Sequence, residues 1–202
     1  MTTKEKKARY YLGVLCILFA VVFVISFNIG KYPISPVELF HVFIGKLTGA
    51  AQDWTNDVEL VIFKIRMPRV LAGAMIGAGL AVAGAAYQGL FRNPLVSPDV
   101  LGASAGAGFG AALALFLGLG YALVTAHAFV CGVAAVGIAY FISIRARQNP
   151  TLGMVLAGIM IGSLFSAGTS FIKLVADPNN ILPTITYWLM GSVAGVDRKS
   201  VV

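Results

Sequence analysis

Few residues in this sequence could carry out chemistry, and they lie apart from one another. His41 and His127 each stand alone, and Cys16 and Cys131 form no Cys-x-x-Cys pair, so neither a metal site nor a disulfide scaffold is indicated. The glycines form neither a Gly-x-Gly-x-x-Gly dinucleotide turn nor a phosphate-binding loop. The apolar stretches contain no carboxylate pair and no Ser/His/Asp set. We therefore expect no catalytic residue, no bound metal and no cofactor.

One pair of basic residues lies just before the second apolar block. Arg66 and Arg69 flank the dipeptide Met67-Pro68. Long basic side chains near a membrane surface can anchor to lipid head groups, and that role is open to this pair.

A stripe of small residues is the second candidate feature. Gly158, Gly162, Ser166 and Ser170 recur at every fourth position, which places them on one face of a helix, with Ser163 beside them. Inside lipid, helices associate through close packing of small residues. The same small and weakly polar face could also line a path through the membrane. Packing and path both remain open for this stripe, and packing is expected for a similar one, Gly102–Gly106–Gly110.

The elements that must position these residues are apolar helices. Charged residues make up 11% of the chain and hydrophobic residues 58%, whereas about 25% charged residues is usual for a soluble domain. A bilayer core about 30 Å thick needs about 20 apolar residues. The blocks that fit or nearly fit this length are residues 10–27, 70–90, 100–119, 121–144 and 152–176. We predict an all-α polytopic membrane protein. Its net charge of +7 is scattered between the blocks, so no nucleic-acid partner is expected.

Residues 28–69 are predicted to form an outer segment that contains a short amphipathic helix. Ser35-Pro-Val-Glu38 has the form of a capping box with proline at the first helical position, and Gly49 ends the run. A second short apolar run, residues 58–65, follows. We expect the amphipathic helix between Ser35 and Gly49 to lie on the membrane or against the helix bundle. Its apolar face comprises Val37, Phe40, Ile44 and Leu47.

Local signals also predict how the later helices begin. Ser97 precedes Pro98 and Asp99, which predicts an N-cap for the third helix. Asn149-Pro150-Thr151 repeats this pattern before the fifth helix.

Basic residues in short loops predict the orientation of the chain. Several precede the first block, Arg92 follows the second, and Arg145 and Arg147 follow the fourth. This pattern places the N-terminus in the cytoplasm and residues 28–69 outside, although the outer segment also carries basic residues.

Longer motifs give the sequence a family resemblance. They are Arg66-Met-Pro-Arg69, Gln88-Gly-Leu-Phe-Arg-Asn-Pro-Leu95, Val155-Leu-Ala-Gly158 and Tyr187-Trp-Leu-Met-Gly191. From about residue 58 onward the chain resembles the FecCD family, the membrane permeases of ATP-driven importers for iron–siderophore complexes, haem and vitamin B12. The resemblance implies the type II importer permease fold, with ten membrane helices. Residues 1–202 would then be a fragment of a single transmembrane permease domain that holds five of them.

The resemblance also implies partners and a location. A second copy of the permease would form a homodimer, cytoplasmic ATPase subunits would drive it, and an extracytoplasmic substrate-binding protein would deliver the substrate. The protein would span the lipid bilayer of a bacterial or archaeal cytoplasmic (inner) membrane. Separate ATPases fit the sequence, because the cores of its apolar blocks hold no acid that could couple transport to an ion gradient.

Matching the family motifs residue by residue gives the expected sites. Arg66 and Arg69 correspond to arginines that pair with acidic residues of the binding protein, with head-group anchoring as their alternative role. A guanidinium suits such pairing, because it is planar, permanently charged and presents a fork of N–H donors to a carboxylate. Thr151 falls in the cytoplasmic gate region, although Leu152 follows it where a second small hydroxyl residue can occur. The helix that lines the translocation path corresponds to the stripe, with packing as its alternative role: Gly158, Gly162, Ser163, Ser166 and Ser170.

The function expected from these observations is that of a transport subunit and not of an enzyme. The substrate would be a metal chelate, with ferric siderophore preferred and cobalamin or haem next. A stand-alone secondary transporter or pore is the alternative, and it would need an intramembrane carboxylate or an inverted repeat with broken helices. A membrane-embedded enzyme would need clustered His, Asp or Ser side chains within the helices.

Overall fold

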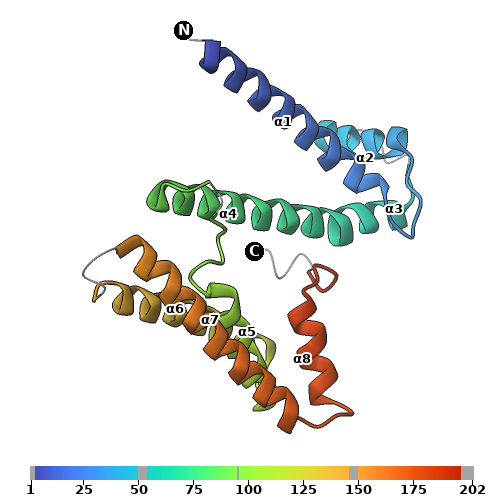
Figure 1. Cartoon of the computed structure of the whole chain (residues 1–202). Coiled ribbons are helices and arrows are strands. Elements are labelled where there is room, and N and C mark those ends of the chain that lie inside the picture. Colours follow the sequence, from blue (N-terminus) through green and yellow to red (C-terminus); the bar gives the residue numbers. More distant parts are fainter. Residues whose placement is uncertain (1–2, 50–53, 95, 146–149, 197–202) are drawn as a thin grey trace. The chain divides into compact units, whose positions relative to one another are not determined.

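The computed structural model describes residues 3–49, 54–94, 96–145 and 150–196, and these ranges contain helices and no strand (Figure 1). They divide into two compact units: Met1–Ala78 with Val193–Val202, and Gly79–Ser192. Three residues used in the predictions, Leu95, Arg147 and Asn149, lie outside the described ranges.

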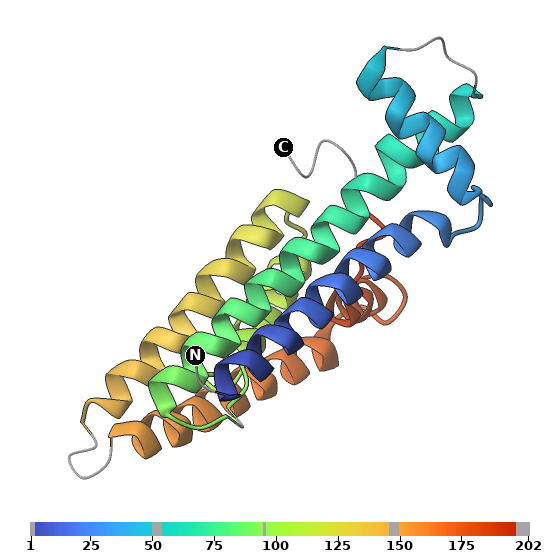
Figure 2. The ribbon, with the colours of Figure 1, turned by 90° about the horizontal axis from the view of Figure 1, so that it is seen from above.

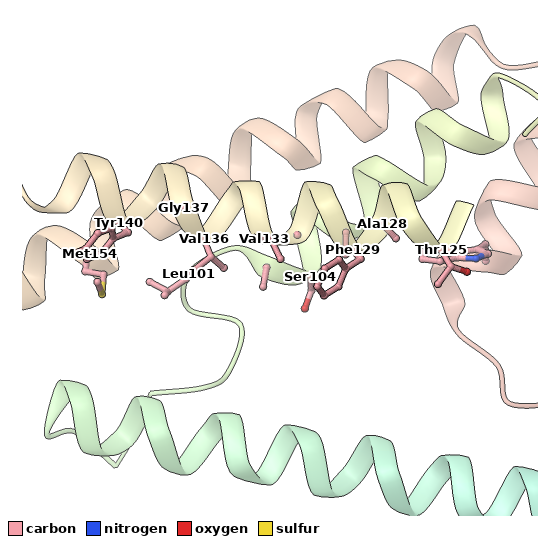
Figure 3. Close-up of a pocket in the computed structure, with 14 residues that line it drawn as sticks. Leu101, Ser104, Thr125, Ala128, Phe129, Val133, Val136, Gly137, Tyr140 and Met154 are labelled. Atoms are coloured by element: carbon pink, nitrogen blue, oxygen red, sulfur yellow. The ribbon is translucent and has the colours of Figure 1, made fainter. Parts of the chain in front are cut away.

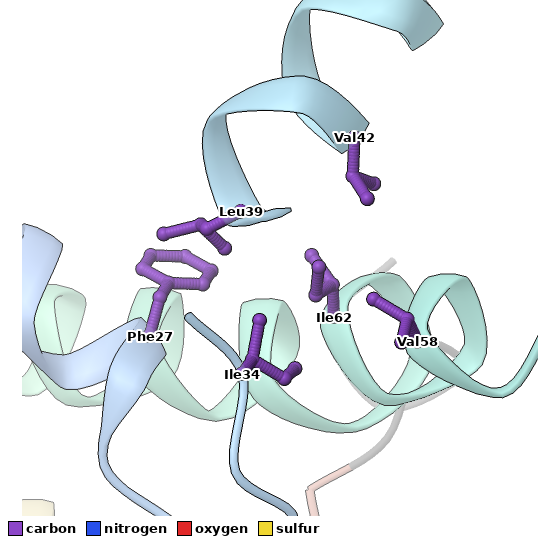
Figure 4. Close-up of a cluster of buried hydrophobic side chains, with 6 residues drawn as sticks. All are labelled: Phe27, Ile34, Leu39, Val42, Val58 and Ile62. Atoms are coloured by element: carbon purple, nitrogen blue, oxygen red, sulfur yellow. The ribbon is translucent and has the colours of Figure 1, made fainter. Parts of the chain in front are cut away.

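The first unit is built around the ends of two long helices. Its elements are α1 (Thr3–Asn28), α2 (Pro36–Thr48), α3 (Asn56–Leu60), the π-helix η1 (Val61–Arg66) and the first part of α4 (Met67–Phe91), which continues into the second unit. α1, α2, α3 and η1 meet at an apolar core made of Phe27, Ile34, Leu39, Val42, Val58 and Ile62 (Figure 4).

Helix α2 has the predicted ends and a different buried face. The Ser35 hydroxyl accepts a hydrogen bond from the Glu38 N–H at 3.1 Å, and Gly49 ends the helix in the left-handed conformation at φ 69°. Leu39, Val42 and Gly45 are the buried residues. The predicted apolar face is exposed and does not pack against other helices within the described residues: Val37, Phe40, Ile44 and Leu47.

The second predicted helix begins earlier than residue 70. α3, η1 and α4 form one helical run of 36 residues, Asn56–Phe91, so residues 56–69 are not a separate outer connection. Val58 and Ile62 anchor its start in the apolar core. Pro68 has no N–H to donate to the preceding turn, and its ring crowds the carbonyl of that turn. The turn directly before it is the wider π-helix Val61–Arg66, which leaves room for the proline ring. The run ends where Arg92 adopts φ 50°, next to the predicted Asn-Pro turn.

The second unit is a group of helices around α5. α5 (Ala103–Phe116) contacts α6 (Tyr121–Ser143), α7 (Pro150–Val175) and α8 (Ile181–Met190), and α6 and α7 run side by side (Figures 1 and 2). Its glycine stripe packs as predicted, since a Cβ added to Gly106 would lie 2.6 Å from the carbonyl oxygen of Cys131 on α6. The other buried residues of α5 are also small: Gly108, Gly110, Ala111, Ala112 and Ala114.

The third predicted helix is shorter than residues 100–119. α5 has 14 residues, or about 21 Å, because Gly102 and Gly118 adopt positive φ values of 74° and 69° and interrupt the helix on both sides. The prediction that Ser97 caps this helix is wrong. The carboxylate of Asp99 instead accepts a hydrogen bond from the Ser104 N–H at 3.0 Å. Helix α8 was not predicted.

In the part of the chain that the structure describes, four helical segments are long and apolar enough to cross a membrane: Glu5–Asn28, Asn56–Phe91, Tyr121–Ser143 and Thr151–Val175. They match the first, second, fourth and fifth predicted blocks. α5 and α8 are shorter apolar helices. Many large apolar side chains on the long segments are exposed, as expected where lipid or further helices are the surroundings.

Candidate functional site

The structure brings Arg66 and Arg69 together in one pocket of the first unit. The pocket has a volume of about 420 Å³ and lies between the end of α1, the connection to α2, η1 and the start of α4. Its third basic residue is Lys31, which the sequence did not single out. Its remaining lining is Ser26, Ile29, Gly30, Tyr32, Val61, Ile65 and Val70.

Arg66 is buried, and its guanidinium is hydrogen-bonded within the protein. Its guanidinium donates hydrogen bonds to the backbone carbonyls of Phe27 and Tyr32, and only 7% of the residue is exposed. Phe27 lies in the last turn of α1, where backbone carbonyls have no partner within the helix. Gly30 makes room for the fork, since a Cβ there would lie 2.7 Å from Nη2 of Arg66. Arg66 therefore fastens the end of α1 to η1.

In the described ranges of the protein, Arg69 makes fewer hydrogen bonds than Arg66 does. It is half-buried, and its Nη2 group donates to the carbonyl of Ala194, which lies in the same unit. Its Nε–H has no hydrogen-bond partner among the described residues. That Nε–H is buried, so an added carboxylate would be bound by the Nη donors that remain among the five N–H groups of the guanidinium.

The glycines of the α7 stripe are packing residues. Gly158 and Gly162 line a hollow of about 460 Å³ against the turn that precedes α5. A Cβ on Gly158 would collide with the carbonyl oxygen of Val100 and lie 2.8 Å from the Cα of Leu101. Gly162 lies next to Gly102, and a Cβ added to Gly102 would sit 3.0 Å from the Gly162 Cα, whereas a Cβ added to Gly162 would lie 3.5 Å from the Gly102 Cα, an ordinary contact distance.

The serines of the same stripe face outward. Ser163, Ser166 and Ser170 are exposed, and Ser163 and Ser166 line the hollow, whereas Ser170 lies beyond it. The hydroxyl of Ser163 donates to the carbonyl of Ile159 at 2.9 Å, so its oxygen can still accept a hydrogen bond from outside. Thr151 is exposed in the first turn of α7 and lines neither pocket. The strip beside the serines is exposed and apolar: Met160, Leu164, Phe171 and Leu174.

A third pocket, of about 880 Å³, lies along α5 and α6 in the second unit (Figure 3). Its lining is almost wholly apolar, with Phe129, Val133 and Val136 at its centre and Ser104, Thr125 and Tyr140 as its hydroxyl groups. Nothing in the sequence singled out this groove. Among the described residues, no three His, Cys, Asp or Glu side chains are close enough to hold a metal ion together.

Comparison with known families identifies this architecture. Residues 18–202 match the FecCD transport family. The chain belongs to that family. Curated FecCD relatives include the molybdate import system permease protein MolB of Haemophilus influenzae, 36% identical over 89% of this chain and 53% of the relative. The iron(3+)-hydroxamate import system permease protein FhuG of Bacillus subtilis is 30% identical over 98% of this chain and 59% of the relative.

A solved structure confirms the fold of this FecCD chain. It is similar to a metal-chelate type ABC transporter in an inward-facing conformation, with a TM-score of 0.77 and 32% identity over 95% of this chain and 56% of that one. The predicted importer permease fold is therefore confirmed, and the chain is a multi-pass membrane protein. It spans about half the length of the curated relatives it matches.

Proposed function

We propose that this chain forms part of the membrane-spanning permease subunit of an ATP-driven, binding-protein-dependent importer. The observation that carries the proposal is the family match over residues 18–202, supported by the likeness to an ABC transporter across 95% of the chain. Both compact units would belong to one transmembrane domain. The protein would work with a second permease copy, cytoplasmic ATPase subunits and an extracytoplasmic binding protein.

The proposed substrate is a metal chelate, and ferric siderophore is the first choice. A ferric hydroxamate permease is among the relatives, and the similar solved structure is of the metal-chelate type. Other relatives are named for molybdate and for vitamin B12. Cobalamin, haem and molybdate are therefore the competitors that a transport assay should include.

The proposed topology places the N-terminus in the cytoplasm of a bacterial or archaeal cell. The basic residues in the first turns of α1, together with Arg92, Arg145 and Arg147, would then lie on the cytoplasmic side of the membrane. Asn28, the last residue of α1, and α2 would lie outside. Thr151, at the start of α7, would lie at the cytoplasmic end, as a gate residue should.

Transport by the full-length permease with its partners tests this function. In proteoliposomes, uptake of a binding-protein-delivered ferric siderophore should require ATP and a catalytically competent ATPase partner, and should persist when ionophores remove ion gradients. Uptake that follows the ion gradient and ignores ATP would instead support the secondary transporter. Uptake of molybdate or cobalamin in place of the siderophore would keep the importer and change its substrate.

The serine strip of α7 is the proposed path lining. Ser163, Ser166 and Ser170 expose small hydroxyl groups on one line of the helix, which suits the passage of a large polar chelate. Gly158 and Gly162 hold α7 in position, because they pack against the turn before α5.

A bulky side chain on the strip should therefore block uptake. We expect Ser166→Phe to lower the uptake rate by at least tenfold while the protein still inserts and assembles. The matched control is Leu164→Phe, on the neighbouring apolar strip, which should keep most of the activity because that position already carries a large exposed apolar side chain. Equal losses in the two variants would contradict a path along the serines.

Arg69 is the proposed docking residue for the binding protein. Arg66 lines the same pocket and holds the end of α1 in place through its hydrogen bonds to backbone carbonyls. We expect Arg69→Glu to weaken docking at least tenfold, because close charge pairs across an interface couple by about 1.5 kcal/mol or more. Binding-protein titration against the permease in nanodiscs measures this change. Lys64→Glu is the control, because Lys64 is exposed and outside the arginine pocket. Unchanged docking by the Arg69→Glu variant would discard the assignment.

A further inference from the structure

Helix α2 exposes a continuous apolar stripe that the proposed function does not use. Phe40 is 63% exposed and Leu47 85% exposed, and Val37 and Ile44 complete the stripe. The opposite face of α2 is already occupied by the core of the first unit. We infer that this stripe inserts into the lipid interface on the side where α1 ends, so that α2 is an in-plane membrane helix that holds the outer segment on the bilayer.

The level of α2 relative to the membrane is set by its contacts with α1. Phe27, in the last turn of α1, packs into the same core as Leu39 and Val42, and its ring centroid lies 5.9 Å from that of Phe43 (Figure 4). The apolar part of α1, residues 10–27, has 18 residues and is about 27 Å long, so it crosses most of the roughly 30 Å hydrocarbon core and its last turn reaches the edge of that core. A helix fixed to its last turn therefore lies at the boundary between acyl chains and head groups.

The orientation of α2 suits that level. α2 turns across the line of α1 where the two helices meet (Figure 2). A helix that crosses the end of a membrane span runs along the membrane surface. Its axis can then lie in the interface with one face towards the acyl chains, which is the arrangement of amphipathic in-plane helices.

The edges of the stripe have the chemistry of an interface. His41 and Thr48 lie at exposed positions along one edge, where they would meet water and head groups. Lys46 lies on the opposite side of α2, between the core-facing positions Leu39 and Val42, and pairs with Glu59 of α3. Tyr32 is exposed in the connection from α1, and tyrosine concentrates at the head-group level of membranes. The stripe itself carries no charge, as insertion among acyl chains requires.

Lipid fits this stripe better than a soluble partner. A surface that met the binding protein only during docking would expose four large apolar side chains to water between encounters, which monomeric surfaces generally avoid. A bilayer covers the stripe at all times and is continuous with the surface that the neighbouring span α1 already presents to it.

Site-directed spin labelling of the full-length protein in nanodiscs tests the inference. Cysteines introduced one at a time as Phe40→Cys, Leu47→Cys and His41→Cys, with Cys16 and Cys131 replaced by alanine, would carry a nitroxide label. Power saturation with oxygen and with a water-soluble nickel chelate then reports the depth of each label. We expect oxygen to dominate at positions 40 and 47 and the nickel chelate to dominate at position 41.

Two results would overturn the inference. Dominance of the nickel chelate at positions 40 and 47 would place the stripe in water. Protection from both reagents would mean that protein covers it, either in the free permease or only after the binding protein is added. The inference depends on membrane insertion and not on the transported species, so a failed uptake assay leaves this test unaffected, and a failed depth test leaves the importer intact.

Discussion

Replacement of Arg66 with methionine is expected to destabilise the first unit by about 3 kcal/mol. The guanidinium of Arg66 donates to two backbone carbonyls, those of Phe27 and Tyr32, and hydrogen bonds to charged groups contribute about 1.5–3 kcal/mol each. Methionine keeps most of the length and removes every donor. The carbonyl at the end of α1 would then be buried without a partner, and the connection to α2 would lose its attachment to η1.

The measurement is the thermal denaturation midpoint of the full-length protein in detergent, with the rate of proteolysis between α1 and α2 as a local readout. Arg66→Lys should fall between the wild type and Arg66→Met, because one ammonium group cannot reproduce the planar fork. Lys64→Met is the matched control, since Lys64 belongs to the same π-helix and is exposed. An Arg66→Met protein as stable as the control would show that the two carbonyls do not depend on Arg66.

A single added methyl group at Gly158 is expected to destabilise the second unit by about 1–3 kcal/mol, the usual cost of overpacking. The Cβ of Gly158→Ala would meet the backbone of Val100 and Leu101, and backbone atoms cannot swing aside as a flexible side chain can. α7 would have to move away from the turn before α5. Because the same helix carries the proposed path, uptake should fall together with stability.

The control for this variant is Gly137→Ala on α6. A Cβ at Gly137 would meet no described atom within 4 Å, and alanine favours helix over glycine by about 0.5–1 kcal/mol. We therefore expect a neutral or slightly raised denaturation midpoint for Gly137→Ala and a clearly lowered one for Gly158→Ala. Similar midpoints for the two alanine variants would contradict the close backbone contact.

Much of the fold follows from signals that lie close together in the sequence. Ser35 and Glu38 begin α2 and Gly49 ends it, because capping involves backbone groups within one or two turns. The long spans follow from length and hydropathy, since lipid requires helices that satisfy their own backbone groups. The start of α5 differs from the predicted one, because Gly102 adopts a left-handed conformation next to Gly162 of α7, and nothing local in this glycine-rich sequence distinguishes Gly102 from the glycines that lie inside helices.

The candidate site shows where local reasoning stops. Arg66 and Arg69 belong to one motif and were predicted to share one role. The structure instead joins Arg66 to carbonyls 34 and 39 positions away and leaves Arg69 with a buried Nε–H that has no partner within the described ranges. Gly158 and Ser166 likewise belong to one stripe, yet Gly158 packs against the turn before α5 and Ser166 is exposed.

By itself, therefore, the sequence determined that this chain lies in a membrane, roughly where its long apolar helices run and which family its motifs resemble. These properties depend on composition, on helical periodicity and on short ordered strings of residues. Only the tertiary structure decided which arginine is buried, which face of α2 is exposed and which small residues of α7 pack. Those outcomes depend on contacts between residues that are far apart in the chain, and a short sequence motif does not indicate which distant residues will meet.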